Sequence, residues 1–234
     1  MLWICIAIMA LAAICVVFYL IEKIKAYSVK ELLIKAFISL LFLVLAIYCS
    51  YVKHRHVLNL FIIIGLVFGF TGDIWLDLKY IYPKDDKVYT YAGFIVFGIG
   101  HIFFITGMYL EFFNNAHFLY ILIPILIALV AAIGNQFLAK PLKLDFKDKK
   151  WIAFSYSIFL FSLPLCTASL LMINGWQNTT LLLLFIGGVL FVLSDLVLSG
   201  TYFGEGHEKP IDFFFNYLFY YSAQFIIAFS IFFL

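Results

Sequence analysis

Two aspartates, Asp73 and Asp195, interrupt long apolar segments of this 234-residue chain. Each follows a small residue, Gly72 in the first case and Ser194 in the second, and each precedes aliphatic residues. An ionisable side chain at membrane depth costs roughly 2.5–3.5 kcal/mol on insertion scales, so such residues usually face a polar interior and perform a function. We therefore expect the chemistry of this protein to take place between these two carboxyl groups.

Small residues predict the direction in which the aspartates point. Gly65 and Gly69 precede Asp73 at intervals of four residues, and Gly188 precedes Asp195 by seven. Residues at these intervals share one face of a helix, and glycines on that face let a neighbouring helix approach closely. Both carboxyl groups should therefore point at neighbouring helices rather than at lipid.

Other polar side chains within apolar segments are candidates for the same site. Tyr217, Tyr220, Tyr221 and Gln224 trace one face of a helix near the C-terminus, where a polar pocket wall is favoured over an interfacial aromatic belt. His101 is equally compatible with a role in the site and with a purely structural hydrogen bond.

Two charged residues, Lys35 and Asp77, lie near the ends of predicted helices. Asp77 follows Asp73 by about one helical turn, so it either contributes to the site or is simply solvated. Lys35 is expected at a depth comparable to that of the aspartates, or shallower.

The composition determines which elements must position these residues. The chain is 66% hydrophobic and 12% charged, whereas a soluble domain is about 45–50% apolar and about 25% charged. Apolar runs of about 20 residues without strand alternation predict helices rather than a barrel. We therefore predict an all-α integral membrane protein, a bundle of eight transmembrane helices in one domain, residues 1–234. The predicted spans are about 2–21, 32–49, 57–78, 91–110, 117–138, 151–173, 179–200 and 213–234.

The distribution of cationic residues predicts the orientation. The odd-numbered connections carry 13 of the 15 lysines and arginines, and the even-numbered connections carry only Lys53 and Arg55. The positive-inside rule assigns the odd connections to the cytoplasm and both termini to the extracytoplasmic side. The basic residues of these loops are explained by their role in orienting the protein in the membrane. We therefore do not interpret them as a nucleic-acid binding surface, and no nucleic-acid partner is expected. Each aspartate then lies about five residues, roughly 8 Å, below the cytoplasmic interface.

Neither a metal nor a cofactor is expected. The four cysteines fall within predicted spans, and no set of His, Asp and Cys residues has the spacing of a zinc site.

Four short motifs resemble those of the YhhN family of eight-span membrane proteins, and they occur in the family's order across essentially the whole chain. They are Gly72-Asp73 with Leu76, Gly98-x-x-His101, Gly188-x-x-Phe191-x-x-Ser194-Asp195 and Tyr220-Tyr221-x-x-Gln224. Lys35 also fits the family pattern, although Ala36 follows it where the family commonly has a proline.

The resemblance implies a lysoplasmalogenase, which hydrolyses the vinyl ether of a lysoplasmalogen to a fatty aldehyde and glycerophosphocholine or glycerophosphoethanolamine. Asp73 and Asp195 would be the acid and base, in undetermined order, because such a route needs one carboxylic acid and one carboxylate. The substrate, a lysophospholipid, would reach the site from the bilayer. The other expected substrate-binding residues are Lys35, for the phosphate, and Asp77, His101, Ser194, Tyr220, Tyr221 and Gln224.

Two other classes of protein share some of these features. Paired intramembrane acids also serve proton relays, so a proton-coupled transporter of small solutes or lipids is the main alternative. A membrane amidase or ceramidase-like zinc hydrolase would need a histidine cluster that this sequence lacks.

The abundance of Phe, Ile and Lys with a single Arg favours an AT-rich genome and thus a bacterial plasma membrane.

Overall fold

Long helices make up nearly all of the chain. The computed structural model describes residues 1–25, 28–53, 56–114, 116–204 and 209–234, and within these residues it has no strand, only an isolated bridge between Leu144 and Gly204. The helices are α1 (Leu2–Lys25), α2 (Val29–Val52), α3 (Val57–Ile81), α4 (Asp86–Phe112), α5 (Leu119–Leu138), α6 (Lys150–Asn174), α7 (Thr179–Phe203) and α8 (Pro210–Ser230). Short 3-10 turns occur at Pro83–Asp85, Lys147–Lys149 and Ile231–Phe233. Eight helices of the described residues are long and apolar enough to cross a membrane, which confirms the predicted fold class.

Local sequence accounts for several helix starts. The Ser28 hydroxyl accepts a hydrogen bond from the Glu31 backbone N–H at the start of α2, and the Asn178 side chain does the same for Leu181 at the start of α7. Both satisfy amide groups that a helix leaves unpaired at its N-terminus. Pro210 lacks a backbone N–H, but it lies in the first turn of α8, where that group would have no partner within the helix. The largest displacement from the predicted spans is at α4, which begins at Asp86 rather than at about residue 91, directly after the 3-10 turn.

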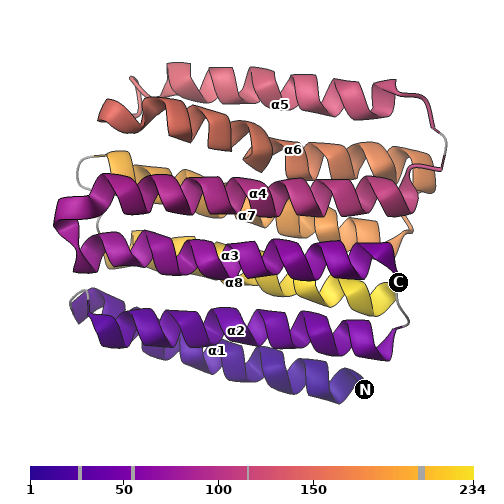
Figure 1. Ribbon diagram of the computed structural model, residues 1–234, viewed down its shortest axis with the longest axis horizontal. Coiled ribbons are helices and arrows are strands. Elements are labelled where there is room, and N and C mark those ends of the chain that lie inside the picture. Colours follow the sequence, from indigo (N-terminus) through magenta and orange to yellow (C-terminus); the bar gives the residue numbers. More distant parts are fainter. Residues whose placement is uncertain (26–27, 54–55, 115, 205–208) are drawn as a thin grey trace.

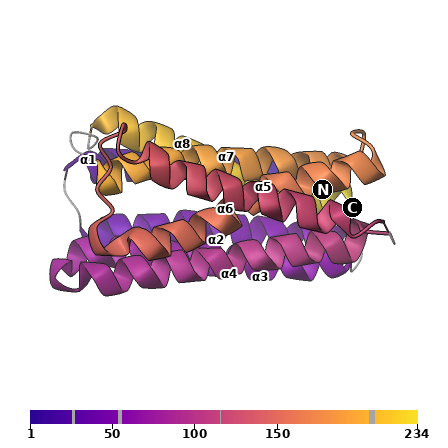
Figure 2. The same ribbon diagram turned by 90° about the horizontal axis from the view of Figure 1, so that it is seen from above.

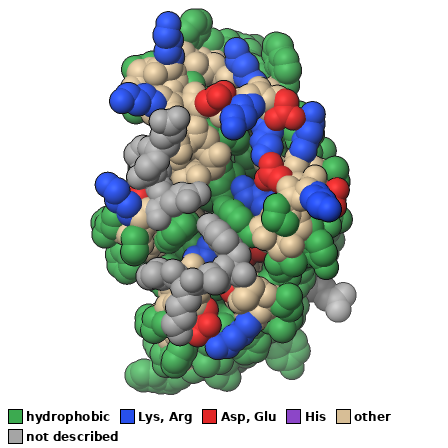
Figure 3. Space-filling model, turned by 90° about the vertical axis from the view of Figure 1, so that its left-hand side faces the viewer, with side chains coloured by type: hydrophobic (Ala, Val, Ile, Leu, Met, Phe, Trp, Pro, Cys, Tyr) green, Lys and Arg blue, Asp and Glu red, His purple; other side chains and the backbone are tan. Residues whose placement is uncertain are grey.

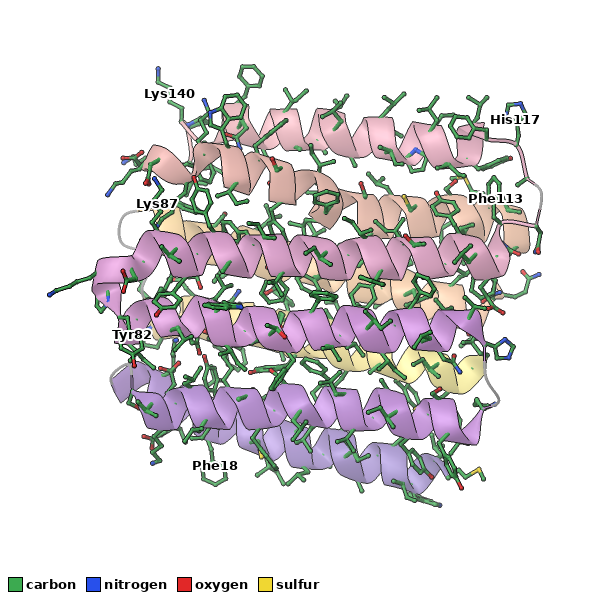
Figure 4. The ribbon with its side chains drawn as sticks, in the orientation of Figure 1. Phe18, Tyr82, Lys87, Phe113, His117 and Lys140 are labelled. Carbon is green, nitrogen blue, oxygen red and sulfur yellow. The ribbon has the colours of Figure 1, made fainter. Side chains whose placement is uncertain are left out.

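The helices run side by side along the long axis of the molecule (Figure 1). Seen from above, α7 and α8 lie in one layer and α2, α3 and α4 in another (Figure 2). Both termini lie at one end of the bundle, and the four odd-numbered connections lie at the other (Figure 1). Lys87 and Lys140 are at the end with these connections, whereas Phe113 and His117 are at the opposite end (Figure 4).

The end with the odd-numbered connections carries most of the exposed cations. Figure 3 looks onto this end and shows lysine side chains around its surface, interspersed with acidic ones. The exposed lysines of these connections are Lys30, Lys84, Lys87, Lys140, Lys143, Lys147, Lys150 and Lys209. Arg55, which the charge count assigned to the opposite end, lies outside the described residues. We refer to this end below as the basic end.

Glycines set the close approach between α3 and α4. A Cβ atom on Gly100 would lie 3.0 Å from the Gly65 carbonyl oxygen, so the two backbones are nearly in contact. Gly69 makes room for a side chain instead, because a Cβ there would lie 2.9 Å from Gln224 Nε2 of α8. The expected glycine face of α3 is therefore used twice, once for α4 and once for the polar face of α8.

Candidate active site between α2, α3, α6, α7 and α8

Asp73 of α3 and Asp195 of α7 line the same internal pocket, although they are far apart in sequence. Asp73 is 2% exposed, and Asp195 is partly exposed. The pocket offers about 30 Å³ to the centres of water molecules, which is room for one or two waters. Its wall is made of Lys35, Asp73, Leu76, Phe94, Phe97, Tyr156, Ser194, Asp195, Leu198, Tyr202, Asn216, Tyr217 and Tyr220.

Three donors surround the Asp73 carboxyl group. Ser39 Oγ donates a hydrogen bond of 2.6 Å to Asp73 Oδ2, and Tyr220 OH donates one of 2.7 Å to the same oxygen. Lys35 Nζ lies 3.5 Å from Oδ1. The Gln224 amide in turn donates to the Tyr220 hydroxyl at 3.0 Å. Donors and a cation around a carboxyl group stabilise its ionised form, so this setting suits a carboxylate.

Asp195 has a different environment. Tyr156 of α6 donates a hydrogen bond to Asp195 Oδ2, and its ring stacks on Phe94 with 5.2 Å between centroids and 4° between planes. No lysine or arginine of the described residues forms a salt bridge with Asp195. Two carboxyl groups in one pocket thus have unequal surroundings, one with a cation and one without.

A buried ion network lies beside Asp73, toward the basic end. Lys35 Nζ is 2.9 Å from Asp77 Oδ1, and Lys23 Nζ is 2.6 Å from Glu31 Oε1 and 3.9 Å from Asp77 Oδ1. All four residues are buried, so Asp77 is ion-paired inside the bundle rather than solvated at the helix end. Lys23 and Glu31 were not among the residues expected from the sequence, because each lies close to a loop, where a charge usually faces water.

Ser194 of α7 is hydrogen-bonded to α8 at the level of Asp195. Its hydroxyl donates to the Asn216 carbonyl oxygen at 3.2 Å, and the Asn216 amide donates to the Ser194 carbonyl oxygen at 2.9 Å. These bonds hold the segment that carries Asp195 against the helix that carries Tyr220. Asn216 shares this role with Ser194, although it was not among the expected site residues.

His101 and Tyr221 lie behind the pocket wall rather than on it. The His101 ring hydrogen-bonds the Phe97 carbonyl oxygen through Nδ1 at 2.8 Å, and it packs edge-on against Phe191 and Tyr156. The other ring nitrogen and the Tyr221 hydroxyl are buried without a hydrogen-bond partner among the described residues. His101 therefore packs against the tyrosine that holds Asp195, but it forms no hydrogen bond with either carboxyl group among the described residues.

The sequence did not indicate Tyr156 or Ser39, the two hydroxyl donors that reach the aspartates from α6 and α2. Ser39 is a single polar residue in an apolar segment, and such serines often bond to their own helix backbone. Tyr156 lies between Ser155 and Ser157, and its residue type alone does not mark it as the partner of a carboxyl group. The available signal was depth, because Tyr156 lies about two turns inside the basic end of α6, at a level similar to that of the aspartates.

The described residues contain no group of three or more His, Cys, Asp or Glu side chains arranged to hold a metal ion. The site that they do form consists of two carboxyl groups, hydroxyl donors and one lysine around a small pocket whose wall also contains apolar side chains. Such a set can transfer protons and stabilise a positive charge on a bound molecule.

A model of the YhhN family matches residues 30–231. This range contains every residue of the pocket wall and excludes the whole of α1. No curated protein and no solved structure matches the chain.

Proposed function

This chain belongs to the YhhN family, and from that membership we propose that it is a lysoplasmalogenase-like hydrolase. It would cleave the vinyl ether of a lysoplasmalogen to a fatty aldehyde and glycerophosphocholine or glycerophosphoethanolamine. The observation that carries this proposal is the pocket shared by Asp73 and Asp195, in which Asp73 has Lys35 beside it and Asp195 forms no salt bridge with a described residue.

The proposed reaction uses one carboxylic acid and one carboxylate. The acid transfers its proton to the β-carbon of the vinyl ether, and the α-carbon becomes part of an oxocarbenium ion. The carboxylate stabilises this cation and takes a proton from the water that attacks the α-carbon. The resulting hemiacetal collapses to the aldehyde and the glycerol hydroxyl, so that one water is consumed for each ether bond broken.

The unequal surroundings support an assignment of the two roles. Asp73 receives hydrogen bonds from Ser39 and Tyr220 and lies next to Lys35, which favours the ionised form. Among the described residues, Tyr156 is the one side chain that donates a hydrogen bond to Asp195. We therefore assign Asp73 as the carboxylate and Asp195 as the acid.

An apolar groove between α1 and α8 supports access from the bilayer. The groove offers about 450 Å³, and its walls include Met9, Ala13 and Val16 of α1 and Phe225 of α8. Tyr217 lines both this groove and the pocket of the aspartates, so the groove lies next to the site. In this proposal the hydrocarbon chain of the substrate occupies the groove, and the head group lies toward the basic end, which the charge bias assigns to the cytoplasm.

The direct test is to incubate the purified protein with a lysoplasmalogen and to measure fatty aldehyde. The expected result is one aldehyde and one glycerophospho-base for each lipid consumed, with no turnover of a lysophospholipid that has an ester in place of the vinyl ether. Proton-coupled uptake into liposomes without any lipid turnover would overturn the proposal and would favour the transporter alternative.

Tyr156→Phe is expected to lower kcat by about tenfold, because it removes a hydrogen bond to the carboxylate that Asp195 becomes when it gives up its proton, and a hydrogen bond to a charged group is worth about 1.5–3 kcal/mol in general. The phenylalanine keeps the stacking on Phe94, so protein yield should stay normal. Aldehyde release by Tyr51→Phe is the control, since Tyr51 is 87% exposed. Equal rates in the two variants would argue against a role for Tyr156.

Ala13→Phe is expected to obstruct the groove and to discriminate between substrates by chain length. For a chain of about 16 carbons the apparent KM should rise by about tenfold, which corresponds to displacing one or two methylenes at about 0.8 kcal/mol each. For a chain of about 8 carbons it should change little. Ala7→Phe is the matched control, because Ala7 is an exposed alanine of α1 that does not line the groove. A uniform effect on both chain lengths would contradict the assignment of the groove.

A further inference from the structure

Three lysines of the described residues are buried, and they differ in their partners. Lys23 is paired with Glu31, and Lys35 is paired with Asp77 and Asp73. Lys79, in the last turns of α3, is only 7% exposed and forms no salt bridge or hydrogen bond with the described residues. Its ammonium group instead lies 3.0 Å from the ring centroid of Tyr202 and 4.8 Å from that of Tyr80.

This position is unusual for a lysine near the end of a transmembrane helix. Lysines at such positions generally extend to the interface and keep the ammonium group in water. A buried cation without a counter-anion is unfavourable, and contact with aromatic rings compensates for only part of the lost hydration. The surroundings of Lys79 are therefore suited to an anion that the described residues do not supply within salt-bridge distance, since Asp86 and Asp77 attract its charge only from farther away.

Lys79 lies close to the aspartate pocket, so an anion bound to Lys79 would lie close to that pocket as well. Tyr202, on which the ammonium group rests, is part of the pocket wall. Lys79 follows Asp73 by six residues on the same helix, roughly 9 Å along its axis toward the basic end. In a lysoplasmalogen, the short glycerol backbone separates the vinyl ether from the phosphate. A vinyl ether at the aspartates thus places the phosphate on the side of Lys79.

Lys35 is less suited to binding the phosphate than its position in the sequence indicated. Its ammonium group is 2.9 Å from Asp77 and 3.5 Å from Asp73, so two carboxyl groups already balance its charge. A phosphate next to Lys35 would also face both of these carboxyl groups. Lys79 has no carboxylate of the described residues within salt-bridge distance.

We propose that Lys79 binds the phosphate of the lysophospholipid substrate, with Tyr202 as the platform that holds the ammonium group at the mouth of the site. This inference rests on the proposed function and deepens it, because it makes Lys79 the residue that selects phospholipids over neutral ether lipids. Lys79 is assigned to binding and not to the proton transfers.

The test compares two substrates that share the vinyl ether and differ in the phosphate, a lysoplasmenylethanolamine and the corresponding 1-alkenylglycerol. For the phospholipid, Lys79→Met should raise the apparent KM by about tenfold or more and leave kcat within about twofold, as expected for the loss of one charge-assisted contact. For the alkenylglycerol, KM and kcat should be unchanged. Lys79→Arg should retain most of the affinity, and Lys84→Met, at an exposed lysine of the neighbouring turn, is the control.

Each outcome of this test decides a separate point. An equal loss on both substrates, or no loss on either, would overturn the role of Lys79. A wild-type protein that releases no aldehyde from either substrate would instead overturn the proposed function. If the methionine variant does not yield folded protein, Lys79→Gln is measured with the same two substrates and judged by the same criteria.

Discussion

Asp195→Asn and Asp73→Asn are each expected to abolish aldehyde release while folded protein is still recovered from the membrane. A carboxamide has nearly the same shape as a carboxyl group, but it can neither deliver a proton to the β-carbon nor accept one from water. General acid–base catalysis contributes about 10²–10⁴-fold in enzymes, so either variant should lose at least two orders of magnitude in kcat. Initial rates of aldehyde formation measure this loss.

The matched control is Asp85→Asn, which removes a carboxyl group at an exposed position of the turn between α3 and α4. Its rate should equal that of the wild type. Full activity in either Asp73→Asn or Asp195→Asn, with the protein intact by gel filtration, would refute the acid–base pair. The double variant should be no worse than the poorer single one, because groups that act in one reaction are not additive.

Lys35→Met is expected to cause the largest loss of stability among single substitutions at the site. The substitution removes the nearest cation of both Asp77 and Asp73. The other carboxyl oxygen of Asp77 already lacks a hydrogen-bond partner among the described residues. Removing one partner of a buried ion pair generally destabilises a protein by about 3–5 kcal/mol. Thermal unfolding in detergent should therefore show a much lower Tm.

A second substitution separates this electrostatic effect from a simple loss of packing. Lys35→Met combined with Asp77→Asn should recover much of the lost Tm, because the second change removes the charge that the first leaves unpaired. Lys30→Met is the control, since Lys30 pairs with Glu22 but is 68% exposed at its side chain, and such surface pairs contribute about 0–1 kcal/mol. A Tm for Lys35→Met equal to that of the control would show that the buried network does not stabilise the fold.

The span pattern of this protein could be predicted because it depends on local composition. Runs of about 20 apolar residues must form helices in a bilayer, where each helix satisfies its own backbone hydrogen bonds. The expectation that Asp73 faces a neighbouring helix rested on the same kind of local information, because Gly65, Gly69 and Asp73 share one helical face. Their spacing could not show that Gly65 approaches α4 while Gly69 accommodates Gln224 of α8.

Partners from distant parts of the chain could not be predicted. Ser39 and Tyr156 are separated from Asp73 and Asp195 by 34 and 39 residues, and nothing in their neighbourhoods marks them as donors to a carboxyl group. The same limit applied to Asp77, for which the sequence left open a contribution to the site and simple solvation at the helix end. The packing of α2 against α3 decided for ion pairing, because it brings Lys35 to 2.9 Å from Asp77.

Eight membrane helices, with Asp73 and Asp195 inside two of them, could be predicted from the sequence, since hydrophobic length and the unfavourable burial of charge are properties of each segment alone. The folded arrangement was needed to show that these two carboxyl groups share one pocket, that Asp73 has a lysine beside it, and that Lys79 is buried with no described carboxylate within salt-bridge distance. The physical reason is that the relative position of two helices depends on the shapes of both packed surfaces, which neither segment carries alone.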